Sequence, residues 1–345
     1  MTRSILAPLS LCLVFHGLAH AFFFFSFNVV VINNEKISCQ LDAETTCTLR
    51  AGHADLTAAL IEHAVQAELV LGALGRKTRE PDLSYLQQPV RYDGEDKLLD
   101  TENDAVMMDW EAPLMERHAE VICATKGDVL NVGFGMGIID GYMQTHEPRS
   151  HTIIEAHPDV HAHIQRTGWT KKKGVKVEFG RWQQVLTRII EHNESLEGGV
   201  KNPAARLFDG VFFDTYGEDY DDLREFHEML PKIMRPGGIY SYFNGLAPDN
   251  IFFHTVYCRL ASAELENLGF ETTFEVCPID TADPKIWSGV KRRYWWGSQY
   301  FLPTCKLAGG GEGRGGGGGS SSSGGGGAGS RAAPGKNKKR KKDMV

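Results

Sequence analysis

Three glycines directly follow a short apolar run, in a position where a parallel sheet would present them to a ligand. Val129–Val132 is apolar at three of its four positions and continues into Gly133, Gly135 and Gly137, as expected for a strand covered on both faces. Glycines let the backbone turn sharply and expose bare N–H groups beside the N-terminus of the next helix. The spacing differs from the dinucleotide pattern G-x-G-x-x-G, and a tight turn in any α/β protein would use the same residues.

Carboxylates close two further strands of the same predicted sheet. His151–Glu155 is a short apolar run that ends in an acid about twenty residues beyond the glycines, where such folds hold a ribose by its hydroxyls. Phe208–Asp214 also ends in an acid, and Arg235–Gly238 reads as a turn that starts another strand, Ile239–Phe243. The carboxyl ends of parallel strands meet in one crevice. The series predicts a ribose-bearing cofactor and resembles class I S-adenosylmethionine-dependent methyltransferases more than dehydrogenases.

Other elements are expected on both sides of these strands. A polar, acidic loop or single-turn cover is expected over Tyr85–Asp104, and one continuous helix over Ala105–Thr125. The remaining expected elements alternate between helix and strand: strand Val175–Gly180, helix Trp182–Glu197, loop Gly198–Arg206, helices Asp222–Met234 and Asp249–Leu268, and a closing antiparallel pair, Glu271–Ile279 and Arg292–Pro303.

Length, charge and cysteines narrow the class of protein. The 345 residues, 42% of them hydrophobic, predict two domains or one large one. Net charge is −7 overall, but residues 1–308 carry 29 basic and 42 acidic side chains, a net −13. Such a body argues against nucleic-acid binding and suits a basic protein partner. The seven cysteines are odd in number and lack a C-x-x-C pair, which predicts reduced thiols of a cytosolic protein.

The two ends of the chain are compositionally distinct. Ser4–Asn34 contains no charged side chain, and Ala19–Ala21 fits a signal-peptidase site. A proline and two histidines interrupt this run, so a membrane or secretory segment, an unusual leader and translated noncoding sequence stay open. Gly309–Gly329 is almost all glycine and serine, as in a flexible linker, and Lys336–Lys342 is either a nuclear address or a solubilising tail. The expected location is cytoplasm, nucleus or both, with membrane anchoring or secretion as the alternative.

A helical region is expected before the main domain. Ala51–Arg79 places apolar residues at helical spacing, and Ala51–Ala64 resembles the tail of an ankyrin repeat. One fragment cannot stack into a solenoid, so an ordinary amphipathic hairpin is an equal interpretation. The predicted organisation is a hydrophobic leader or mispredicted segment over 1–34, a short helical region over 35–80, a methyltransferase domain over 81–308, and a Gly/Ser linker with a basic tail over 309–345.

Six short motifs make the resemblance specific. Together they resemble guanidinoacetate N-methyltransferase, and still more its relatives, the protein arginine N5-methyltransferases of fungi and plants. The motifs are Val106–Glu111, Asn131–Gly137, Ile153–His157, Gly180–Trp182, Phe212–Tyr216 and Arg235–Asn244, within a similarity that covers Ala51–Cys305. Gln66–Leu74 and Asp96–Asp100 fit the protein-modifying branch, which carries ankyrin repeats before its catalytic domain. This chain departs from that pattern, with at most one degraded repeat.

The resemblance implies methylation of a guanidino group, most specifically the delta nitrogen of arginine in a protein such as a ribosomal or other basic protein. It implies a Rossmann-like seven-stranded sheet with an antiparallel last strand, and it matches Glu111 and Asp214 to the acids that contact the guanidino group. A guanidinium stays protonated and presents a planar fork that suits carboxylates. Two facing carboxylates would orient one nitrogen and hold its proton. Without the resemblance, Glu111 would read as a solvated helix carboxylate and Asp214 as a capping acid.

The resemblance also places the cofactor, S-adenosyl-L-methionine. Tyr85 and Met107 would cover its methionine end, and Asp214 would reach its amino group. The other implied contacts run along the glycine turn, the ribose and the adenine: Gly133, Phe134, Gly135, Met136, Gly137 and Ile138, then Glu155, Ala156 and His157, and finally Arg181 and Trp182. Met107 and Trp182 are equally read as plain core residues.

Two other functions stay open. The first is a small-molecule guanidinoacetate N-methyltransferase, and the second is a non-catalytic module that keeps the fold as a scaffold, which has no need of Glu111 and Asp214. A metal site at His157, His161 and His163 is not predicted, because no cysteine or acid completes a ligand set at conventional spacing. Methyl transfer from a sulfonium also needs no metal.

Overall fold

The computed structural model describes most of the predicted main domain and little of the two ends. The described residues are 83–197, 200–201 and 205–309, together with 30–32, 35–37 and single positions between 58 and 69. The signal-peptidase-like site, the glycine-serine linker beyond its first residue and the basic run therefore lie outside the described residues. The described positions between 58 and 69 are helical, and Val65 packs against Val256 and Leu260. Earlier in the chain, β1 (Val30–Ile32) pairs antiparallel with β2 (Glu35–Ile37).

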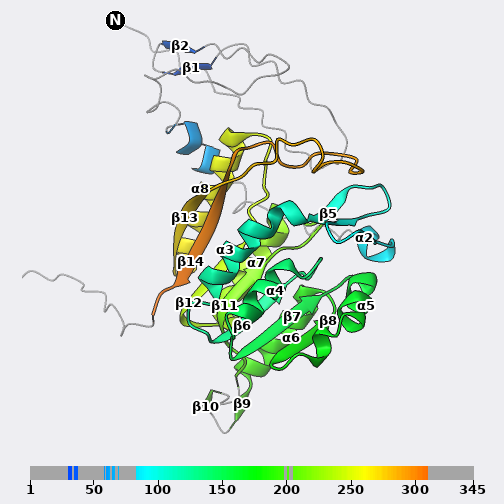
Figure 1. Ribbon diagram of the computed structural model, residues 1–345. Helices are drawn as coiled ribbons and strands as arrows, with labels where there is room; N and C mark the ends of the chain where they lie inside the picture. The colour runs from blue at the N-terminus through cyan, green and yellow to red at the C-terminus, as the bar shows by residue number, and fades with distance from the viewer. Residues whose placement is uncertain are drawn as a thin grey trace, which may run out of the picture. The chain divides into compact units, whose positions relative to one another are not determined.

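A seven-stranded sheet forms the centre of the main domain (Figure 1). Its order is β13-β14-β12-β11-β6-β7-β8, and only the pairings of β14 with β12 and β13 are antiparallel. The chain runs outward from β6 in one direction and from β11 in the other, so the order reverses between these two strands. This confirms the predicted Rossmann-like methyltransferase fold with its antiparallel last strand. The strands are β6 (Asp128–Val132), β7 (Ser150–Glu155), β8 (Val175–Phe179), β11 (Phe208–Phe213), β12 (Met234–Tyr242), β13 (Phe270–Pro278) and β14 (Gln299–Leu307).

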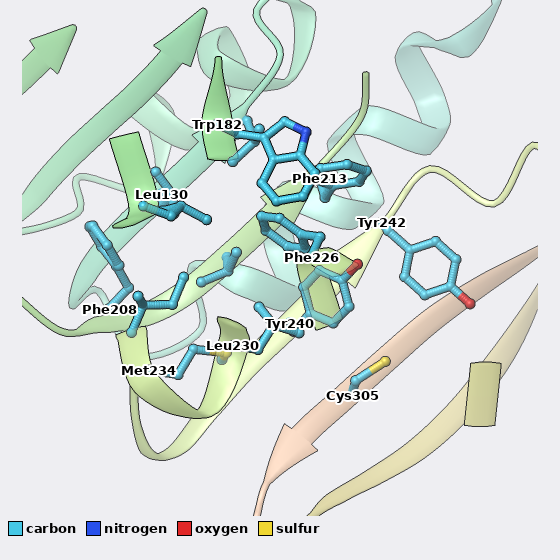
Figure 2. Packing of buried hydrophobic residues seen from close by; sticks show 14 of the residues in the cluster. Leu130, Trp182, Phe208, Phe213, Phe226, Leu230, Met234, Tyr240, Tyr242 and Cys305 are labelled. Carbon is cyan, nitrogen blue, oxygen red and sulfur yellow. The ribbon is translucent and has the colours of Figure 1, made fainter. Parts of the chain in front are cut away.

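Helices cover both faces of the sheet, as strands with apolar side chains on both sides require. In β6, Leu130 and Val132 belong to one buried cluster and Val129 to the other. The first cluster includes Phe226 and Leu230 of α7 and is shown in Figure 2. Truncating a fully buried phenylalanine such as Phe226 to alanine would cost about 3–5 kcal/mol. One face packs on α3 (Ala112–Ile122), α4 (Ile138–Thr145) and α5 (Pro158–Arg166), the other on α6 (Trp182–Glu194), α7 (Tyr220–Ile233) and α8 (Ile251–Asn267).

A small antiparallel sheet precedes α3, and here the sequence predictions were wrong. The expected loop over 85–104 contains β3 (Arg91–Asp93) and β4 (Lys97–Leu99) after the single turn α2 (Ser84–Gln87). The expected helix over 105–125 begins instead as β5 (Ala105–Met108), which pairs with β4. A 3-10 turn, η1 (Asp109–Glu111), leads into α3, whose first turn contains Pro113. Proline favours the start of a helix and cannot donate within it, which fixes the true boundary.

Other element boundaries also differ from those predicted. The expected turn Arg235–Gly238 is an irregularity inside β12, whose pairing with β11 shifts register there. The helix predicted to end at Glu197 ends at Glu194, and β9 (Leu196–Glu197) follows it. Its partner β10 (Val200–Lys201) lies within the predicted loop 198–206. The last strand begins at Gln299 rather than Arg292, because the preceding residues are held by side-chain contacts to other parts of the domain. No helix in the described ranges is long and apolar enough to cross a bilayer.

Candidate active site

A cavity of about 410 Å³ lies at the carboxyl ends of β6, β7 and β11, where the strand order reverses. This is the crevice in which open α/β sheets bind ligands. Nine of the predicted site residues line it: Tyr85, Met107, Gly133, Gly135, Glu155, Ala156, Arg181, Trp182 and Asp214. The other six are not among its lining residues: Glu111, Phe134, Met136, Gly137, Ile138 and His157.

The glycine turn is packed so closely that side chains are excluded. Gly133 has φ 90°, and a Cβ atom there would lie 1.8 Å from the backbone oxygen of Asp214. At Gly135, with φ 54°, a Cβ atom would lie 2.8 Å from Sδ of Met107. Gly137, with φ 74°, caps α4. The first two glycines thus let the backbone form the cavity wall, which supports the reading of this turn as a ligand cradle.

Glu155 is buried at the end of β7 and braces the glycine turn. Its Oε2 accepts from the Phe134 N–H at 2.9 Å, and its Oε1 accepts from the His157 N–H at 2.6 Å. Burial raises its pKa, while these backbone donors act in the opposite direction. Because the side chain also lines the cavity, lone pairs that these donors do not use can accept hydrogen bonds from a ligand, such as those of ribose hydroxyls.

His157 supports the wall rather than lining it. Its Nδ1 accepts the Asp159 N–H at 3.2 Å and so caps α5, which leaves Nε2 protonated to donate to the Gln88 carbonyl at 2.9 Å. The same ring contacts Tyr85 with centroids 4.8 Å apart. His157 therefore connects α5 to the α2 segment and positions Tyr85 over the cavity.

Met107 and Tyr92 fix the glycine turn from the small sheet. The Met136 N–H points at Sδ of Met107 at 3.3 Å, and the Tyr92 hydroxyl donates to the Gly135 carbonyl at 2.9 Å. The Tyr92 ring stacks on His163 with centroids 4.0 Å apart. Sequence reasoning missed Tyr92, because it lies 43 positions from its partner and within a segment predicted as loop.

Trp182 is both a core residue and a wall residue. It is 3% exposed and packs in the larger cluster, while its indole N–H donates to the Glu218 carboxylate at 2.8 and 3.0 Å. Thr215 donates to the same carboxylate, and burial raises the pKa of Glu218. Glu218 lines the cavity but was not predicted. Its only signal in the sequence is its position four residues after Asp214.

Glu111, which is buried, and Asp214, which is half-buried, form a pair of acids on the other side of the cavity. Glu111 is 3% exposed, and burial together with the charge of Asp214 raises its pKa to about 8. Burial raises the pKa of Asp214 to about 7. Raised pKa values favour a proton held on such a pair, and a bound cation favours its release. Asp214 lines the cavity, and Glu111 stands behind it at the start of α3.

Aromatic rings from a distant segment enclose Glu111. The Tyr294 hydroxyl donates to Oε1 of Glu111 and accepts the Trp110 indole N–H at 2.9 Å. Trp110 lies against Trp287 and Trp295 with centroids 6.1 Å apart in both cases. Trp287, Tyr294 and Trp295 belong to the connection between β13 and β14, which was predicted in part as strand. They surround the acid with apolar surface, which explains its raised pKa.

Acidic side chains dominate the mouth of the cavity. The Tyr216 hydroxyl donates to Asp100 at 3.1 Å, and Arg292 makes a two-point ion pair with Asp104 at 3.0 and 2.7 Å. Seven acids and two arginines line the cavity: Asp100, Glu102, Asp104, Glu155, Asp214, Glu218 and Asp222, with Arg181 and Arg292. This charge balance suits a cationic ligand better than an anionic one.

The three histidines considered for a metal site each make a different contact. His161 stacks on Phe179 with centroids 4.4 Å apart, His163 stacks on Tyr92, and His157 caps α5. Across the part of the chain that the structure describes, no three His, Cys, Asp or Glu side chains gather in a group that could hold a metal ion.

Comparison with known families matches residues 77–266 to the model described as guanidinoacetate N-methyltransferase. Curated relatives include the proteins named protein arginine N-methyltransferase 2 of Yarrowia lipolytica, 37% identical over 65% of this chain and 47% of the relative, and of Aspergillus oryzae, 38% identical over 66% and 52%. The Saccharomyces cerevisiae protein of that name is 32% identical over 70% and 57%. The chain spans about half the length of these relatives.

Solved structures give a more distant likeness. The O-methyltransferase TomG from Streptomyces achromogenes, solved in complex with SAM, is 13% identical and aligns over 66% of this chain and 96% of its own, with a TM-score of 0.40. At this level of similarity the fold assignment rests on the strand order.

Proposed function

The chain belongs to the guanidinoacetate N-methyltransferase family, and from that membership and its site we propose that it is an S-adenosylmethionine-dependent methyltransferase that acts on a guanidino group. The observation that carries this proposal is the pair of acids beside the cavity, the buried Glu111 and the half-buried Asp214, whose pKa values are both raised. Two carboxylates in apolar surroundings are costly unless a cation or a proton compensates them. A guanidinium supplies both the charge and a planar set of donors.

The cavity fits the methyl donor. The backbone at Gly133 and Gly135 leaves no room for a Cβ atom, and Glu155 lines the cavity with acceptor oxygens. Tyr85, Met107, Ala156, Arg181 and Trp182 complete the wall against which the nucleoside and the methionine part would lie. When bound, this cofactor supplies an electrophilic methyl group on a positively charged sulfur. The acidic lining favours that positive charge.

Glu111 and Asp214 have a defined task in this reaction. Ionised, they bind the guanidinium through charge-assisted hydrogen bonds and restrict it to one orientation. As a nitrogen becomes alkylated it must lose a proton, and acids with pKa values of about 8 and about 7 are suited to accept it near neutral pH. The lone pair of a protonated guanidinium is delocalised, so orientation and proton acceptance are the two contributions that the protein must make.

We propose further that the acceptor is an arginine in a basic protein and that its delta nitrogen is methylated. The names of the fungal relatives support a protein acceptor. The net charge of −13 over residues 1–308 and the acid-lined mouth also favour a basic partner over a small acceptor that carries its own carboxylate. The resemblance to the N5-specific branch supports the choice of nitrogen.

The test uses the full chain with labelled S-adenosylmethionine and a basic protein extract, followed by acid hydrolysis. We expect labelled protein bands that yield delta-methylarginine, and no label with Glu111→Gln. Glu116→Gln is the matched control, because Glu116 is an exposed acid on α3, the helix that Glu111 precedes. Omega-methylated arginine would refute the choice of nitrogen. Label in guanidinoacetate but in no protein would favour the small-molecule reaction, and no binding of S-adenosylmethionine would refute the enzyme assignment.

A further inference from the structure

Hydrogen bonds to Glu111 are concentrated on one of its two oxygens. Oε1 accepts from the Met108 N–H at 3.2 Å and from the Tyr294 hydroxyl. Among the residues that the structure describes, none donates a hydrogen bond to Oε2. Two donors on one oxygen restrict the orientation of the carboxylate, and its second oxygen keeps its acceptor capacity.

The direction of the Tyr294 hydrogen bond follows from its other partner. An indole N–H can only donate, so the Tyr294 oxygen is the acceptor toward Trp110, at 2.9 Å. The single hydroxyl proton is therefore free to point at Glu111. Burial and the charge of Glu111 raise the pKa of Tyr294 well above its usual value, which keeps that proton in place.

Tyr294 is itself held in place by contacts of the two residues Lys291 and Arg292 and by packing of its own ring. Two and three residues earlier, Arg292 pairs with Asp104 and the Lys291 N–H donates to the Asn103 carbonyl at 2.8 Å. The Tyr294 ring also packs edge-on against Trp287 with centroids 5.2 Å apart. The phenol thus reaches Glu111 from a braced segment, 183 positions along the chain.

We propose that Tyr294 is the positioning residue of the acceptor site: it holds Oε1 of Glu111, so that Oε2 is presented to the guanidino group in its ionised form. This rests on the proposed function for the identity of the ligand, but the effect on Glu111 itself does not depend on turnover. Loss of the phenol hydroxyl removes a donor that lowers the pKa of Glu111, so the carboxyl should stay protonated to higher pH.

The test compares Tyr294→Phe with Tyr220→Phe in the full chain. Tyr220 is a matched control, because its hydroxyl also donates to a glutamate, Glu264 at 2.7 Å, and neither of these two residues lines the cavity. The readout is the infrared band of the protonated Glu111 carboxyl as pH rises, identified by its absence in Glu111→Gln. We expect the midpoint in Tyr294→Phe to rise by about one pH unit or more and to stay unchanged in Tyr220→Phe.

Activity provides the second readout, with S-adenosylmethionine and the basic protein extract. Tyr294→Phe should lower kcat at least about tenfold and move the acid limb of the pH profile upward, with donor Kd unchanged. If Tyr294→Phe does not fold, Trp110→Phe replaces it, and the same upward shift, smaller in size, is expected. An unchanged Glu111 midpoint overturns the proposal, whether or not activity falls. The Glu111 midpoint could shift in Tyr294→Phe even though the wild-type protein methylates no acceptor. That result would support the positioning role of Tyr294 and refute only the proposed function.

Discussion

The two sides of the cavity use buried acids in opposite ways. On the donor side, Glu155 accepts hydrogen bonds from two backbone N–H groups within the same sheet edge, Phe134 and His157. On the acceptor side, Glu111 has one backbone donor and one phenol, and it faces a second acid, Asp214. Glu155 is thus stabilised by fixed local structure, whereas the pair is left in need of a positive charge.

This difference shows how one cavity can separate two binding tasks. A ribose is neutral and needs acceptors that are already oriented, which the backbone donors to Glu155 provide. A guanidinium is a cation, and apolar surroundings strengthen its attraction to carboxylates once they are ionised. The aromatic rings around Glu111 raise its pKa in the empty site and strengthen the same attraction in the occupied one.

Glu111→Gln should produce the largest functional change and confine it to the acceptor side. We expect kcat to fall by about two orders of magnitude or more, because a charge that faces the guanidinium is lost. The Kd for S-adenosylmethionine, measured by calorimetry, should stay within a few-fold of wild type. Glu116→Gln should alter neither quantity. A parallel loss of donor affinity in Glu111→Gln would mean that the two sides are not separate.

Glu155→Ala should show the reverse pattern. Losing a charged acceptor of ribose hydroxyls should weaken donor binding by about 10- to 100-fold, equivalent to about 1.5–3 kcal/mol. At saturating donor, kcat should stay within a few-fold of wild type. Glu155→Gln keeps one carbonyl acceptor and should lose less affinity than alanine. Normal donor affinity in Glu155→Ala would remove Glu155 from the cofactor site.

The pH dependence should also differ between the two sides. The acids of the pair have pKa values raised to about 8 and about 7, so below these values a bound guanidinium must displace a proton. The acceptor KM should therefore rise about tenfold per pH unit as pH falls from 8 toward 6. Donor Kd should change far less over the same range. A flat acceptor KM would show that the pair is ionised before the acceptor binds.

Local patterns in the sequence predicted the glycine turn and the acid of the proposed donor side. The strand Asp128–Val132 was placed correctly, and Gly133, Gly135 and Glu155 line the cavity as expected. Each lies within a short motif whose backbone geometry dictates its residues. Asp214 was predicted from a local pattern as well, because it directly follows the buried strand β11.

Long-range contacts on the acceptor side were beyond prediction from local patterns. Glu111 was identified only through a family resemblance, since its own segment alternates between strand and helix propensity and was predicted as a continuous helix. Tyr294 was missed because its role depends on a contact across 183 positions. Tyr92 and Glu218 were missed for the same reason. Apolar periodicity indicates which face of a helix or strand a residue lies on. It does not indicate which distant side chain contacts that residue.

The smallest expected effect is on stability, and it separates the two sides without any substrate. The pKa of Glu111 is raised in the folded protein from 4.5 to about 8, so the unfolded chain binds fewer protons between these values. The free energy of unfolding of the wild type should therefore fall as pH rises from about 4.5 to 8. Glu111→Gln removes that loss, so above pH 8 it should be more stable by about 1–3 kcal/mol, a Tm gain of a few degrees. Below pH 4.5 the gain should vanish, and Glu116→Gln should show no such pH dependence. Thermal melts across this range check the sign, and a Glu111→Gln variant that is less stable than wild type at high pH would show that the buried carboxylate is compensated before any acceptor binds.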